Sequence, residues 1–189
     1  TLLWCGPILL DPAHTAADVG DPLHMAWAMA WVAHQVVRNP LELFNANAFY
    51  PYRNSLAFGD HLLPEGLLGL PVNLMTGNAV LALNLVTAFG LVSSALAAFF
   101  LVRSLLGSPG AGLLAGTVVA FNGFTQGELL RVNVIQLQGW SLALLFLWRF
   151  ANAPSWRNGW LFSLSLALQG LTGTYYAVYA ALLAPGLVV

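Results

Sequence analysis

The stretch NAVLALNLVTAFGLVSSALAAFFLV, residues 78–102, carries no charged side chain and is long enough to cross a bilayer as a single helix. An α-helix rises about 1.5 Å per residue, so roughly 20 apolar residues cover a hydrocarbon core that is ~30 Å thick. The rest of the chain is similar, because 59% of its residues are hydrophobic and only 7% are charged. This composition predicts an all-α protein, a polytopic bundle of transmembrane helices, rather than a soluble globule.

Further apolar runs lie on both sides of this segment. The apolar run of residues 1–10 stops at Asp11-Pro12, because proline disfavours a helix there. Ten residues are too few to cross a bilayer. We therefore expect a fragment whose first helix is cut. After Trp160 two short helices are expected, with a turn near Gly173. Residues 1–189 are thus expected to form one membrane-embedded N-terminal fragment. Its parts are the end of a first span (1–10), an external loop (11–77) and about five short or full spans (78–189), which include Gly110–Phe121 and Trp140–Phe150 and a loop at Ala151–Gly159.

Ionisable side chains are concentrated before the long apolar stretch. Residues 11–71 hold all four histidines and six of the seven acids: Asp11, Asp18, Asp21, Glu42, Asp60 and Glu65. Leu23 to Arg38 has helical spacing, with His24, Trp27, Trp31 and His34 on one face and Met25, Met29, Val32 and Val36 on the other. Its length of about 24 Å and its tryptophans favour a helix lying in the membrane interface. A second short interfacial helix is expected from Asp60 to about Met75, interrupted by Pro64 and Pro71.

The arginines orient the chain in the membrane. Arg103, Arg149 and Arg157 fall in two short loops that alternate with the external loop and with a polar hairpin, Asn122 to Gln138. The positive-inside rule places these two loops in the cytoplasm and the polar regions outside. Because the chain has no lysine and a net charge of −1, no nucleic-acid partner is expected. The single cysteine, Cys5, excludes an internal disulfide and a cysteine-built metal site.

Two Asp-containing junctions in the external loop are candidates for chemistry. Gly20-Asp21-Pro22 opens the first short helix, and Asp before Pro is a favourable helix start, so capping alone explains it. The functional interpretation is that Asp21, beside Asp18 and His24, acts as a base or binds a divalent cation. Gly59-Asp60-His61 repeats the arrangement at the second short helix, with the same two interpretations.

Arginines on the outer side point to a phosphate ligand. Arg53 lies in a turn-rich aromatic loop, Asn45 to Asn54, and Arg131 lies in the polar hairpin. A guanidinium group binds phosphate through a bidentate fork, so a lipid phosphate or pyrophosphate is a reasonable partner. Glu128 and Arg131 are one helical turn apart in sequence, and a simple pairing between them is the other interpretation.

The order of these parts resembles the GT-C superfamily of membrane glycosyltransferases, which use polyprenyl-phosphate or polyprenyl-pyrophosphate sugars. The resemblance rests on Gly20-Asp21-Pro22, on the aromatic helix with Trp27 and Trp31, and on Phe49-Tyr50-Pro51-Tyr52-Arg53. A bacterial family of multi-spanning, glycosyltransferase-like proteins is similar at Asp21-Pro22-Leu23, His34-Gln35, Phe44-Asn45-Ala46-Asn47 and Leu56-Ala57-Phe58-Gly59-Asp60-His61.

The resemblance implies a GT-C-like fold in a bacterial cytoplasmic (inner) membrane, with the site on the periplasmic or extracellular side. It implies that Asp21 is the essential carboxylate, with Asp18 or Asp60 as second choices. Asp21 would deprotonate an acceptor hydroxyl, which attacks the anomeric carbon while Arg53 or Arg131 stabilises the departing lipid phosphate. The residues expected to bind substrate are His24, Arg53, His61, Glu128 and Arg131. A divalent cation, Mg²⁺ or Mn²⁺, stays open because the second external loop offers one acid, Glu128, and no acidic pair.

Two rival functions stay open from the sequence. A transporter or flippase of a lipid-linked saccharide would place ionisable groups inside its spans and often shows internal repeats, and neither feature is evident. A non-catalytic membrane assembly subunit would keep the fold without the activity, and the missing acidic pair is compatible with it.

Overall fold

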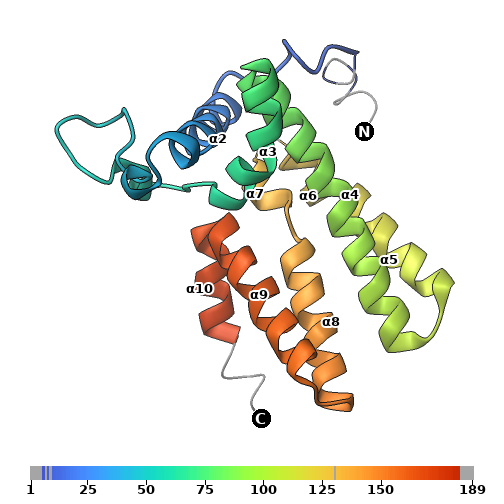
Figure 1. Cartoon of the computed structure of the whole chain (residues 1–189). Coiled ribbons are helices and arrows are strands. Elements are labelled where there is room, and N and C mark those ends of the chain that lie inside the picture. Colours follow the sequence, from blue (N-terminus) through green and yellow to red (C-terminus); the bar gives the residue numbers. More distant parts are fainter. Residues whose placement is uncertain (1–5, 7, 9, 130, 184–189) are drawn as a thin grey trace. The chain divides into compact units, whose positions relative to one another are not determined.

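The structure is a computed structural model that describes residues 6, 8, 10–129 and 131–183 (Figure 1). All regular elements within these residues are helices, as the sequence predicts. The expected end of a first span, residues 1–10, lies largely outside the described residues. In chain order the elements are α2 (Asp21–Arg38), η1 (Pro40–Glu42), η2 (Ser55–Phe58), α3 (Leu63–Thr76), α4 (Ala79–Leu106), α5 (Pro109–Phe121), α6 (Gly123–Gly127), α7 (Val132–Ile135), α8 (Gln138–Asn152), α9 (Trp156–Thr172) and α10 (Thr174–Leu183).

The described residues divide into two compact units. Unit 1 is Thr1–Ala88 with Leu129–Asn133, and unit 2 is Phe89–Glu128 with Val134–Val189. Helix α4 therefore contributes residues 79–88 to unit 1 and residues 89–106 to unit 2.

Helices α2 and α3 pack along each other in unit 1, and the predicted helix from Leu23 to Arg38 is confirmed as α2. The stripe of α2 that contains Met29 and Val32 is fully buried. Glycines let the helices approach closely, because a Cβ added to Gly66 of α3 would lie only 2.6 Å from the Val32 side chain. Full burial of side chains of this size stabilises a fold by about 1.5–3 kcal/mol each.

The second short helix differs from its prediction at its start and inside, whereas its end at Thr76 agrees with the expected end near Met75. Helix α3 starts at Leu63 rather than Asp60, after Leu62, which adopts a left-handed conformation. Pro64 lies in the first turn, where a missing N–H costs nothing, and Pro71 lies inside a helix that continues to Thr76. The expected interruptions at the two prolines are therefore wrong. The helix ends at Gly77, whose φ of 65° suits glycine, and the Gly77 N–H donates to the Asn73 carbonyl.

Polar side chains at the start of α4 bind the segment that precedes α2, residues 12–15. Asn84 Nδ2 donates to the carbonyls of Pro12 and Thr15 at 2.8 and 2.9 Å. Asn78 Nδ2 donates to the Ala13 carbonyl at 2.8 Å. These bonds satisfy loop carbonyls that have no helical partner and fix residues 12–15 on the first turns of α4.

In unit 2 the predicted run Gly110–Phe121 is confirmed as α5, which starts one residue earlier at Pro109. The predicted turn near Gly173 is also confirmed, because α9 ends at Thr172 and α10 begins at Thr174. The predicted loop Ala151–Gly159 is shorter than expected, since α8 continues to Asn152 and α9 starts at Trp156. The helix N-cap Ser155, whose side chain accepts from the Asn158 N–H, explains the early start of α9.

A buried polar network surrounds the break between α7 and α8. Ser94 Oγ of α4 accepts from the Leu137 N–H at 2.9 Å, and Gln169 of α9 donates to the Gln136 carbonyl at 2.8 Å. The same Gln169 side chain accepts from the Trp140 N–H at 3.1 Å and so caps α8 from a neighbouring helix. Backbone groups released by the break are thereby satisfied inside the helical unit.

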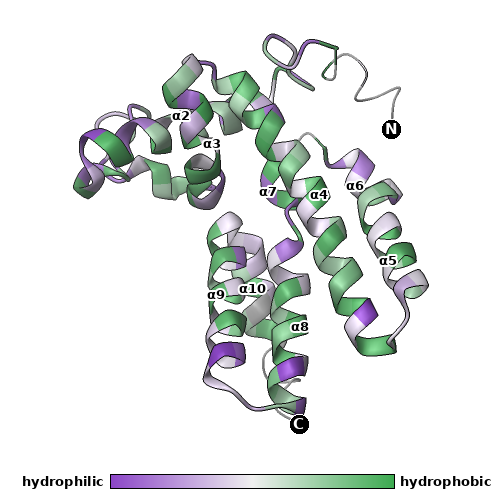
Figure 2. Cartoon of the chain, turned by 45° about the vertical axis from the view of Figure 1, so that its right-hand side comes forward, coloured by the Kyte–Doolittle hydropathy of each residue, from purple (hydrophilic) through white to green (hydrophobic). Residues whose placement is uncertain are grey.

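Two stretches of the described residues are long and apolar enough to cross a membrane: Ala79–Leu106 and Val132–Asn152. The first agrees with the predicted span Asn78–Val102, but it starts one residue later and continues to Leu106. The second combines α7, the break and α8. Figure 2 shows the apolar colouring along both. Arg103 and Arg149 lie in the last turns of α4 and α8.

Candidate functional site

Asp21 lies in the first turn of α2 and forms an ion pair with Arg131. Arg131 Nε donates to Asp21 Oδ2 at 2.8 Å, and both side chains are about half exposed. The N-cap of α2 is Gly20, which makes no side-chain capping bond. The capping interpretation of Asp21 is therefore wrong, because its carboxylate is directed at a guanidinium rather than at the N–H groups of its own helix.

Asp60 is held by the same short segment that supplies Arg131. Asn133 Nδ2 donates to Asp60 Oδ2 at 2.8 Å, and Asn133 is 2% exposed. Asp60 precedes α3 by three residues, so it does not cap that helix as predicted. Residues 131–133 thus contact both acidic junctions of the external loop, and Asn133 is a site residue that the sequence analysis missed. Its only signal in sequence is an amide within an otherwise apolar run, Val132-Asn133-Val134-Ile135.

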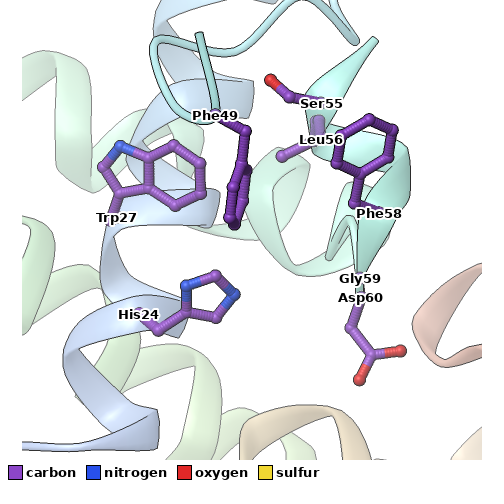
Figure 3. Close-up of a pocket in the computed structure, with 8 residues that line it drawn as sticks. All are labelled: His24, Trp27, Phe49, Ser55, Leu56, Phe58, Gly59 and Asp60. Atoms are coloured by element: carbon purple, nitrogen blue, oxygen red, sulfur yellow. The ribbon is translucent and has the colours of Figure 1, made fainter. Parts of the chain in front are cut away.

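Beside Asp60 lies a pocket of about 180 Å³ between α2 and the loop that precedes α3. Figure 3 shows the imidazole of His24 and the carboxylate of Asp60 at one end and aromatic rings at the other. Trp27 Nε1 donates to Asn47 Oδ1 at 3.1 Å, which ties α2 to the aromatic loop. The lining residues are His24, Trp27, Phe49, Ser55, Leu56, Phe58, Gly59 and Asp60.

The aromatic wall of the pocket is built by contacts between loop residues. Phe49 and Phe58 have ring centroids 5.9 Å apart, and Tyr52 meets Phe58 edge-on at 6.1 Å. His24 stacks at a tilt on Trp27, with centroids 5.5 Å apart. Exposed aromatic faces next to a carboxylate and an imidazole make a small site that combines apolar contact with hydrogen bonding.

His61 lies next to Asp60 but is not among the pocket-lining residues. Its Nδ1 accepts from the Leu63 N–H at 3.3 Å, and its ring meets Phe44 edge-on. Partial burial lowers the pKa of His61 below 6.5, and the nearby Asp60 carboxylate opposes that shift. This geometry gives His61 a place at the start of α3, whereas its expected contact with substrate stays a prediction.

Asp18, Arg53 and Glu128 are not among the residues that line this pocket. Asp18 is exposed and its Oδ1 accepts from the Val19 N–H at 2.6 Å, a local turn contact. Arg53 is exposed in the aromatic loop. Glu128 belongs to unit 2, at the C-cap of α6. Glu128 and Arg131 do not share a helix, because α6 ends at Gly127 and α7 begins at Val132.

A metal centre is not assigned to this site. Within the described ranges, no three His, Cys, Asp or Glu side chains are grouped closely enough to hold a metal ion.

In comparisons with known proteins, no family model, no curated protein and no solved structure matches this chain.

Proposed function

We propose that this chain is part of a membrane glycosyltransferase that moves a sugar from a polyprenyl-phosphate donor to an acceptor hydroxyl. The observation that supports this best is the pocket in which the Asp60 carboxylate and the His24 imidazole lie beside Trp27, Phe49 and Phe58. Aromatic faces pack against the C–H faces of a sugar ring, and carboxylate and imidazole groups hydrogen-bond its hydroxyls. A volume of about 180 Å³ suits one ring, being smaller than the ~300–1,000 Å³ of drug-sized sites.

The proposed reaction uses Asp60 of the pocket together with the Asp21–Arg131 ion pair. Asp60 accepts the proton of the acceptor hydroxyl, and the hydroxyl oxygen forms a bond to the anomeric carbon with inversion. The bond from that carbon to the phosphate oxygen breaks, and the phosphate leaves with the electron pair. Arg131, paired with Asp21 one turn from His24, supplies positive charge for that phosphate. Asp21, the first choice from sequence, is the second candidate for the base.

The proposed setting is a bacterial cytoplasmic membrane with the pocket on its outer side. Helix α4 is long and apolar enough to span, and so is the stretch Val132–Asn152. Arg149 lies in the last turn of α8 and Arg157 in the first turn of α9, so the α8–α9 turn is positively charged. Cytoplasmic loops carry an excess of such charges. This charge favours a cytoplasmic position for the α8–α9 turn and an outer position for the start of α8.

The test uses membranes that contain the full chain and a radiolabelled polyprenyl-phosphate sugar. Loss of a general base typically costs 10²–10⁴-fold in rate, so Asp60→Asn is expected to lower transfer by at least about 100-fold. Asp21→Asn is compared in parallel to decide which carboxylate is the base. Asp11→Asn is the matched control, because Asp11 is an exposed acid whose partner is His14.

Each outcome of this assay has a meaning. Full transfer by folded Asp60→Asn and Asp21→Asn protein would refute both assignments of the base. Movement of the lipid-linked sugar across the bilayer without transfer would identify a transporter, and neither activity would identify a non-catalytic subunit.

A further inference from the structure

Helix α3 has an apolar face that no described part of unit 1 covers. The face turned to α2 carries Gly66 and Gly69, which contact Val32 and Met29. The opposite face is exposed and apolar throughout, although α3 is only 14 residues long. The residues of this outer face are Leu67, Leu68, Pro71, Leu74 and Met75, and the last is 86% exposed.

The polar side chains of α3 are turned back on its own backbone. Asn73 Nδ2 donates to the Gly69 carbonyl at 3.2 Å, and Thr76 Oγ1 donates to the Val72 carbonyl at 2.7 Å. The one acid of the helix, Glu65, is fully buried. Such back-bonding hides donors where water is scarce and is common in helices within lipid.

The outer face is also continuous with an apolar segment. No charged residue occurs from Gly66 to Val102, and α3 is followed after Gly77 and Asn78 by α4, which is apolar enough to cross a membrane. A water-facing helix normally carries charged side chains on its exposed face. The exposed face of α3 carries none.

We infer that the outer face of α3 lies among lipid acyl chains, so that α3 is a partly immersed helix rather than a helix resting on the headgroups. The occupant of this face is the bilayer itself. The inference needs a membrane around α4 but does not depend on sugar transfer.

This placement fixes which side of unit 1 faces water. Trp27 and Met29 are two positions apart on α2, about 200° around a helix of 3.6 residues per turn, so the pocket side of α2 is opposite its α3 side. The face of α2 that lines the pocket is thus turned away from the outer face of α3.

The experiment measures the environment of single cysteines in the full chain, with Cys5 replaced by serine, in phosphatidylcholine–phosphatidylglycerol vesicles. Leu68→Cys and Met75→Cys are compared with Ala57→Cys, an exposed position between the pocket-lining residues Leu56 and Phe58. A membrane-impermeant maleimide is expected to label Leu68→Cys and Met75→Cys at least about 10-fold more slowly than Ala57→Cys. After unfolding in dodecyl sulfate all three should label equally.

Spin labels at the same positions distinguish lipid from protein as the cover. Lipid-exposed labels collide readily with molecular oxygen and rarely with a water-soluble nickel chelate. High oxygen and low nickel collision at positions 68 and 75 supports the inference. Labelling as fast as Ala57→Cys, or low collision with both reagents as in a protein contact with a second copy, would overturn it.

Discussion

Arg131 donates to the carboxylate of Asp21 across 110 residues of sequence, with Nε and Oδ2 2.8 Å apart. The pair joins the start of α2 to the segment before α7, both within unit 1. Both side chains are about half exposed, so the pair is screened by water and contributes little to stability. The pair positions the Arg131 guanidinium beside Asp21, in the acidic junction at the start of α2.

Arg131→Gln is therefore expected to change the free energy of unfolding by less than about 1 kcal/mol. The same variant should lower sugar transfer by at least about 10-fold if Arg131 stabilises the leaving phosphate. Thermal unfolding and transfer are measured on the same preparation. Arg157→Gln, an exposed arginine in the α8–α9 turn, is the control and should alter neither.

Asn133→Ala is expected to destabilise unit 1 by about 1–3 kcal/mol, because it removes a buried donor to Asp60. Asn133→Asp should be worse at neutral pH, since it places a second carboxylate against the first. Unfolding is followed between about pH 7 and pH 4, where protonation of one carboxyl should restore part of the loss in Asn133→Asp. Equal stability of wild type and Asn133→Asp at pH 7 would contradict the contact.

His61 is expected to make folding stability depend on pH. Burial holds its folded pKa below 6.5, so the unfolded chain binds the proton more readily. Its contribution is intact above about pH 6.5 and is lost as the pH falls from there through the folded pKa. The free energy of unfolding should therefore decline more steeply over this window in wild type than in His61→Gln. Equal slopes in wild type and in His61→Gln would contradict a lowered pKa of His61.

Gly66→Ala is expected to cost about 1–3 kcal/mol, because the new methyl group would lie 2.6 Å from the Val32 side chain. Val32→Ala in the same chain should recover part of that loss, and a double-mutant cycle measures the coupling. The control is Gly123→Ala, where an added Cβ meets no atom within 4 Å. Independent, additive effects of Gly66→Ala and Val32→Ala would show that α2 and α3 do not approach as closely as described.

Local patterns in the sequence were sufficient to find most helices. The two stripes of α2 are visible as a period of three and four residues, and Met29 and Val32 are buried as that period predicts. The charge-free run in α4 and the glycine between α9 and α10 are equally local signals. The expected interruption of α3 at Pro71 is wrong, because proline is typical of a helix break while close packing on α2 offsets the cost of one missing hydrogen bond.

The sequence by itself determined that the chain is helical and apolar, and that its acids and histidines gather before α4. Only the tertiary structure decided that Asp21 pairs with Arg131 and that Asp60 accepts a hydrogen bond from Asn133. It also decided that Asp60 and His24 line the same pocket. The physical reason is that helix period and hydropathy are properties of neighbouring residues. Pairing across 110 and 73 positions depends instead on how the chain places Arg131 and Asn133 beside residues distant in sequence, and no local period encodes that placement.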